Sequence, residues 1–153
     1  MSSGADHNDL DAELAALTSK HAWLITPIAG GDRLAAACAM AGIDAEAVST
    51  EIGAIAQLAD PLHLDASAIS ISRLLGKNEL LAVERADGLL TINSWAEGAK
   101  VKKLAPGLVL DGAPSGVLDL LSGSGELAEL GEVFPSSKIG KFAAFRLLRK
   151  KRK

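Results

Sequence analysis

Residues 66–95 constrain the fold most, because apolar and polar residues alternate along this stretch and two turn signals interrupt it. Alternation with a period of two gives each run one face for a core and one face for water, which is typical of β-strands. The turn signals are Gly76-Lys77-Asn78 and Ala86-Asp87-Gly88, and Asp-Gly between alternating runs is a strong hairpin signal. The pattern therefore predicts three antiparallel strands in a meander, at residues 68–75, 79–85 and 89–94.

Two elements are predicted at the start of the chain. Asp9 or Asp11 provides an N-cap for a helix that extends to about residue 20, and three leucines share one face of it: Leu10, Leu14 and Leu17. A strand is predicted at residues 22–28, which are mostly apolar. Pro27 marks an edge or the end of this strand, because proline cannot donate a hydrogen bond to a ladder.

The run from Arg33 to Met40 has two interpretations. Its alanine content favours a helix, whereas its place after the turn Gly30-Gly31-Asp32 favours the second arm of a hairpin. We favour a strand, because the strand at residues 22–28 otherwise lacks a partner. Asp44 then provides an N-cap for a predicted helix that ends near Ala59, with these residues on its apolar face: Val48, Ile52, Ile55 and Leu58.

The part of the chain after Trp95 has weaker patterns. Lys100–Leu104 and Leu108–Leu110 are predicted as short strands, while Val117–Leu121 is too short to separate strand from helix. Ser136 is a predicted cap for a last helix, whose apolar positions fall on one side: Ile139, Phe142, Ala143 and Leu147.

These elements predict an α+β protein, in which helices cover an antiparallel meander sheet and a C-terminal helical extension carries a basic tail. The 153 residues suit one sizeable core, and with 3% aromatic residues that core must be mainly aliphatic. We expect a disordered N-terminus at residues 1–8, an α+β domain at 9–95, an extension packed on it at 96–135, and a basic amphipathic helix or tail at 136–153.

The charge of the chain is divided between its body and its tail. Eight of the 16 Lys and Arg residues follow residue 137, where no Asp or Glu occurs, so the tail carries +8 and the remainder, with 19 acidic residues, carries −11. This asymmetry indicates an appended contact segment. The candidate partner-binding residues of the tail are Lys138, Lys141, Phe142, Phe145, Arg146, Arg149, Lys150, Lys151, Arg152 and Lys153.

Three interpretations of the tail stay open. The tail is either a solvated terminus, a segment that binds an acidic protein or nucleic acid without reading a sequence, or a segment that lies on an anionic membrane surface. No apolar run approaches the ~18 residues that span a bilayer, and no basic segment followed by an apolar one opens the chain.

No reactive constellation stands out in the sequence. His7, His21 and His63 have no metal-ligand spacing, and neither a nucleophile elbow nor a phosphate-binding loop motif is present. The lone Cys38 cannot form an internal disulfide, which predicts a reducing compartment and a buried thiol. We therefore expect no catalytic residues, no metal, no cofactor and a cytoplasmic protein.

The sharpest local string is residues 117–128, which resembles the first motif of Rossmann-type methyltransferases that bind S-adenosylmethionine. In that fold a strand ends at a Gly-rich turn, so that a ligand approaches backbone N–H groups at a helix start. The alternative ligand-binding residues are therefore Asp119, Gly123 and Gly125. Because no acidic residue follows Glu132 to hold a ribose, we favour a capped turn between two apolar segments.

The order of predicted elements over residues 9–95 resembles the roadblock (dynein light chain) family, within the wider profilin-like α/β group. The matching parts are Leu14 and Leu17, Leu24 to Ala35, the helix of Ala45 to Ala59, and the strands at 68–75, 79–85 and 89–94. The resemblance implies a homodimer with a continuous sheet or a helix pair, and no catalytic residues of its own. It also implies a role as a scaffold or a regulator of small GTPases or motors.

We therefore expect a non-enzymatic scaffold or regulatory adaptor that acts through protein–protein contacts as a homodimer. A small GTPase is the partner that the resemblance implies. Two alternatives stay open: a protein that binds S-adenosylmethionine or a nucleotide at the Gly123–Gly125 turn, and a protein that binds nucleic acid or a membrane surface through its tail.

Overall fold

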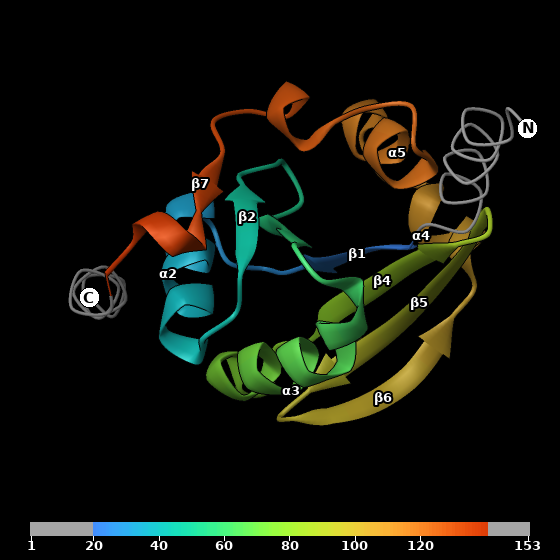
Figure 1. Cartoon of the computed structure of the whole chain (residues 1–153). Helices are drawn as coiled ribbons and strands as arrows, with labels where there is room; N and C mark the ends of the chain where they lie inside the picture. Colours follow the sequence, from blue (N-terminus) through green and yellow to red (C-terminus); the bar gives the residue numbers. More distant parts are fainter. Residues whose placement is uncertain (1–19, 141–153) are drawn as a thin grey trace, which may run out of the picture.

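Seven β-strands form one antiparallel sheet in the order β6-β5-β4-β1-β3-β2-β7, with helices on both faces (Figure 1). These features belong to a computed structural model that describes residues 20–140. The strands are β1 (Lys20–Ile25), β2 (Ala45–Val48), β3 (Ile55–Leu58), β4 (Leu80–Ala86), β5 (Leu89–Ala96), β6 (Ala99–Leu104) and β7 (Phe134–Pro135). The α-helices are α2 (Gly31–Ala41), α3 (Leu64–Leu75), α4 (Pro106–Leu110) and α5 (Ser115–Ser122). The 3₁₀ turns are η1 (Pro61–His63), η2 (Leu127–Glu129) and η3 (Ser136–Lys138).

The predicted α+β class with an antiparallel sheet is confirmed, and both faces of the sheet are buried. On the central strand β1, Ala22 and Leu24 belong to a core that includes residues of α2 and α3. Trp23 and Ile25 belong to a second core that includes residues of α5 and η2. Because alternate residues of β1 enter two different cores, the strand reads as a continuous apolar run.

The predicted strand at residues 68–75 is wrong, because residues 64–75 form helix α3. Ala68 and Ile71 are both fully buried and lie three residues apart, which is the helical spacing. The buried hydroxyl of Ser72 donates to the carbonyl of Ile69 and accepts the N–H of Gly98, so a polar residue also occupies the inner face. The alternation of isoleucine and serine at residues 69–72 therefore fits a strand as well as a helix, and it misled the prediction.

The other two predicted strands of the meander, at residues 79–85 and 89–94, are confirmed as β4 and β5. The third strand of the observed meander is β6, which confirms the strand predicted at residues 100–104. Residues 96–135, expected as an extension on a domain, thus supply β6 and β7 to the same sheet.

The preference for a strand at residues 33–40 is wrong, because residues 31–41 form helix α2. Alanine has the highest helix propensity, and here it decided the local structure. The helix ends at Gly42, whose left-handed φ of 76° suits glycine. The predicted strand at residues 22–28 is confirmed over residues 22–25. It pairs with β3 and β4 rather than with residues 33–40.

The predicted helix over residues 44–59, with Asp44 as its N-cap, is also wrong. This segment forms the hairpin β2–β3, in which Val48 pairs with Ile55. The turn of the hairpin contains Gly53 with a φ of 118°, a conformation that no α-helix accepts. The apolar residues of the two strands happen to repeat with a helical spacing, which misled the interpretation.

Two short segments near the C-terminus are helical. The predicted strand at residues 108–110 is wrong, because these residues belong to α4, which begins at Pro106. Residues 117–121 lie within α5, which answers a question that the sequence left open.

The prediction that Ser136 caps a helix that continues through Ile139 is wrong. The hydroxyl of Ser136 accepts the N–H of Ala45 and donates to the carbonyl of Ile43, at distances of 3.0 and 2.7 Å, and so fixes the chain beside β2. Ile139 has extended backbone angles (φ −107°, ψ 117°), so a helix from Ser136 is not continuous through it.

The predicted N-terminal helix before residue 20 and the tail after residue 140 lie outside the described residues, as does the N-terminus at residues 1–8. Within residues 20–140, no helix combines the length and the apolar composition that a membrane crossing requires.

Candidate functional site

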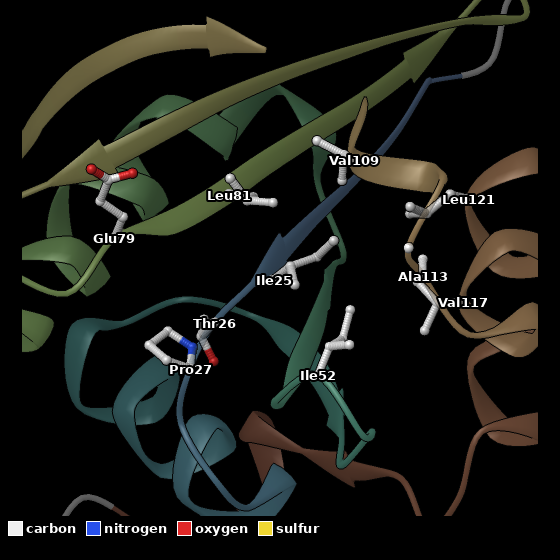
Figure 2. Close-up of a pocket in the computed structure, with 11 residues that line it drawn as sticks. Ile25, Thr26, Pro27, Ile52, Glu79, Leu81, Val109, Ala113, Val117 and Leu121 are labelled. Carbon is white, nitrogen blue, oxygen red and sulfur yellow. The ribbon is translucent and has the colours of Figure 1, made fainter. Parts of the chain in front are cut away.

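An apolar cleft of about 370 Å³ opens where β1 ends, between the start of β4 and the segment that contains α4 and α5 (Figure 2). Its larger apolar lining residues are Ile25, Ile52, Leu81, Val109, Val117 and Leu121. In Figure 2 the side chains of Val117 and Leu121 lie opposite Ile25 and Ile52 across the opening. The cleft has the size of a small-ligand or side-chain pocket.

The sheet register and the helix period bring these residues together. Ile25 pairs with Leu81 on β4 and with Ile55 on β3, so all three side chains project from the same face of the sheet. On α5, Val117 and Leu121 are four residues apart and therefore share one side of the helix. The cleft is thus built on regular elements on both sides.

The polar groups at the cleft are few. The hydroxyl of Thr26 donates to the carbonyl of Ala54 at 2.9 Å and accepts the N–H of Ile28 at 3.2 Å, so the fold itself satisfies it. Among the residues of the described part of the chain, Glu79 is the one titratable residue that lines the cleft; it is exposed and precedes β4. The cleft therefore suits an apolar group, with a carboxylate beside it that favours a neighbouring cation.

Cys38 lies inside α2 with no exposed surface, and burial raises the pKa of its thiol from 9.0 to about 12. The thiolate is the reactive form of cysteine, so this side chain is inert in the folded protein at neutral pH. The predicted buried thiol is confirmed by the free, buried cysteine.

The Cys38 thiol should make stability depend on pH in the alkaline range. Above pH 9 the unfolded chain releases the thiol proton while the folded chain, with a pKa of about 12, retains it. The unfolded state then binds fewer protons, so the thiol's contribution is complete below about pH 9 and falls as pH rises. Between pH 8 and pH 10 the stability of the wild-type chain relative to Cys38→Ala should fall by about 1.4 kcal/mol, measured by denaturant unfolding. A constant difference between the two proteins would contradict the burial of the thiol.

The Gly123–Gly125 turn lacks the arrangement that ligand binding of the methyltransferase type requires. It follows the C-terminus of α5 rather than a strand, and Gly123 is the left-handed cap of that helix with a φ of 97°. The N–H groups of Ser124 and Gly125 both donate to the carbonyl of Asp119 at 2.9 Å. Asp119, Gly123 and Gly125 are therefore brought together as a helix cap, whose N–H groups are already bonded.

As far as the structure describes them, the other sequence-based candidates do not converge on the cleft. Lys138 is exposed in η3, while the remaining candidate tail residues, from Lys141 onward, lie outside the described residues. His63 lies 3.6 Å from Asp60, and His21 contacts Arg85. Nowhere in residues 20–140 do three or more His, Cys, Asp or Glu side chains gather as a metal site.

Sequence reasoning named none of the cleft residues as a site. One signal was present: four consecutive apolar residues, Ala22 to Ile25, indicate a strand that is buried on both faces. That signal predicts a covering layer on each face, but not where the covering layer leaves a gap.

Comparison of the chain with models of protein families, with curated proteins and with solved structures finds no match.

Proposed function

We propose that the protein is a non-enzymatic adaptor that binds a partner protein by taking an apolar side chain of the partner into the cleft. The observation that supports this proposal is the lining of the cleft among the described residues: six large aliphatic side chains, a hydroxyl bonded within the fold, and one carboxylate at the edge. Large apolar side chains that enter such pockets supply most of the affinity at many protein interfaces.

The carboxylate of Glu79 at the edge of the cleft indicates a second chemical feature of the partner. Glu79 is exposed beside the apolar lining, and Figure 2 shows it apart from the side chains of α4 and α5. A partner segment with a large apolar residue next to a Lys or Arg would place the cation near Glu79. The ion pair at this exposed position would contribute to specificity more than to affinity.

The proposal includes a homodimer, a cytoplasmic location, a tail that contacts an acidic partner, and the roadblock-like resemblance with a small GTPase as the implied partner.

The edge strand β6 is a poor surface for a dimer with a continuous sheet. It carries Lys100, Lys102 and Lys103, and a bulge interrupts its pairing with β5, two features that oppose edge-to-edge association. We therefore place the dimer contact on another surface.

The test of this function is a peptide that binds the full chain, selected from a displayed library of random peptides. We expect the selected peptides to share one large apolar residue next to Lys or Arg, and to bind with micromolar affinity in fluorescence polarisation. Gly112 lines the cleft and has open space around its Cα, so Gly112→Trp should fill the opening and weaken binding at least tenfold.

Gly107→Trp is the matched control, because Gly107 is also exposed with open space around it but does not line the cleft. Its affinity should equal that of the wild-type chain, whereas Glu79→Gln should weaken binding about threefold, as is typical of an exposed ion pair. Equal affinity of Gly112→Trp and wild type would exclude the cleft as the binding site. Heat released on titration with S-adenosylmethionine or with a nucleotide would favour the ligand-binding alternative.

A further inference from the structure

A second concavity, of about 480 Å³, lies on the same face of the sheet as the apolar cleft, beside the C-terminal end of α5. Unlike the cleft, it gathers several polar side chains: His21, Arg85, Gln57, Glu46 and Glu126. Trp23 also lines it. Neither the apolar cleft nor the proposed adaptor function uses these side chains.

The sheet register places four of the polar side chains in two adjacent rows on four strands. Arg85 on β4 pairs with His21 on β1, and Gln57 on β3 pairs with Trp23 on one side and with Glu46 on the other. Residues that pair directly across strands project from the same face, so all of these side chains share one surface.

Arg85 and His21 form the basic end of this surface, and hydrogen bonds hold them in place. One terminal nitrogen of Arg85 (Nη1) donates to the carbonyl of Leu121 at 2.8 Å, and the other (Nη2) donates to Nδ1 of His21 at 3.2 Å. The guanidinium carbon lies 5.4 Å from the centre of the Trp23 ring, and Gly123 leaves room for the guanidinium group. Within residues 20–140 no carboxylate lies within ion-pair distance of Arg85.

Within residues 20–140, these bonds leave defined hydrogen-bond donors without an acceptor at the concavity. Because Arg85 can only donate, Nδ1 of His21 must accept, and the proton of the neutral ring is on Nε2. Burial, and secondarily the charge of Arg85, lowers the pKa of His21, which keeps the ring neutral at pH 7. Gln57 accepts the indole N–H of Trp23 at 3.0 Å through its Oε1, which leaves its NH₂ group as a donor.

We propose that this concavity binds a small peptide-like zwitterion, whose carboxylate contacts Arg85 and His21 and whose ammonium group contacts Glu46. Positioned donors around a guanidinium that has no carboxylate partner within residues 20–140 favour a carboxylate, and the exposed carboxylate of Glu46 favours a cation. Three strand spacings, about 14 Å, separate β4 from β2, so the ligand must be longer than a single amino acid. The proposed ligand is a dipeptide, whose extended chain is about 7 Å long; the side chains of Arg85, His21 and Glu46 would span the remaining distance.

The experiment uses the full chain labelled with ¹⁵N, with dialanine as the probe and its C-terminal amide and N-acetyl forms as controls. Dialanine should shift the side-chain resonances of Arg85 and His21 with millimolar or better affinity. Removal of either charge from the peptide should weaken binding at least tenfold. Absence of shifts at 20 mM dialanine, or equal binding of the amide or the acetyl form, would overturn the proposal.

A variant of the acidic end tests the role of Glu46 without touching the basic end. Glu46 is exposed on β2, so Glu46→Gln should fold normally, bind dialanine about tenfold more weakly and bind acetyl-dialanine as the wild type does. Glu84→Gln removes the same charge on the opposite face of β4 and should bind dialanine as the wild type does. Equal weakening by both variants would mean a general charge effect and would exclude this site. Gly112→Trp should leave dialanine binding unchanged, so this proposal and the proposed function can fail separately.

Discussion

Replacement of Gly53 with alanine is expected to lower the free energy of unfolding by about 3 kcal/mol or more. Gly53 has a φ of 118°, which residues with a Cβ rarely adopt. A Cβ there would also collide with the carbonyl oxygen of Thr26, on backbone that the hydrogen bond from Thr26 N to Ala54 O fixes in place. Denaturant unfolding followed by tryptophan fluorescence measures the loss.

Gly42→Ala is the control for this prediction. Gly42 also has a left-handed φ, of 76°, but nothing lies within 4 Å of an added Cβ. Only the conformational cost remains, so the expected loss is about 1 kcal/mol. Losses of the same size at both positions would contradict the close approach of the β2–β3 turn to the end of β1.

Trp23→Ala should be the most damaging of the core truncations, with a loss of about 3–5 kcal/mol. Trp23 is 1% exposed at the centre of the sheet, in the core formed with α5. The substitution would leave a cavity and deprive Gln57 of its hydrogen-bond donor. The guanidinium of Arg85 would also lose the ring over which it lies.

A more conservative substitution separates these contributions. Trp23→Phe retains an aromatic ring but removes the indole N–H, so a loss of about 1–2 kcal/mol is expected. A loss below about 1.5 kcal/mol for Trp23→Ala, measured in the same unfolding assay, would mean that the second core does not centre on this residue.

The part of the sheet that sequence predicted well depends on local signals. Asp87 and Gly88 have φ values of 54° and 80°, as a tight hairpin turn requires, and they join the two strands that were predicted correctly. Glu97 and Gly98 repeat the same conformation, with φ values of 53° and 84°, between β5 and β6. The hairpin signal at residues 86–88 therefore recurs in a similar form at residues 96–98, where no hairpin was predicted.

The errors arose where two periods fit the same residues. Residues 44–59 have apolar side chains at helical spacings, yet the chain forms two strands that pair with β1 and with β7. Residues 68–75 alternate like a strand, yet they form a helix against β4 and β5. In both cases the tertiary partner decided the structure, and single-sequence periodicity contains no information about that partner.

The candidate site was beyond the reach of sequence reasoning for a related reason. The cleft joins Ile25, Leu81 and Val117, which are distant in the chain and become neighbours only through the sheet register and the position of α5. None of them has a distinctive chemistry by itself. The Gly-rich string beside α5 attracted attention because its motif is local, and its role proved to be that of a helix cap.

The most direct test of the central claim, that the apolar cleft receives a side chain of a partner, is a titration of the full chain with a selected peptide. The probes are isotope-labelled methyl groups of isoleucine, leucine and valine, observed by NMR. The account predicts that the largest shifts belong to Ile25, Leu81, Val117 and Leu121, which line the cleft. Binding that leaves these methyl groups unchanged and shifts those of the opposite core, such as Leu34 and Ile71, would contradict it.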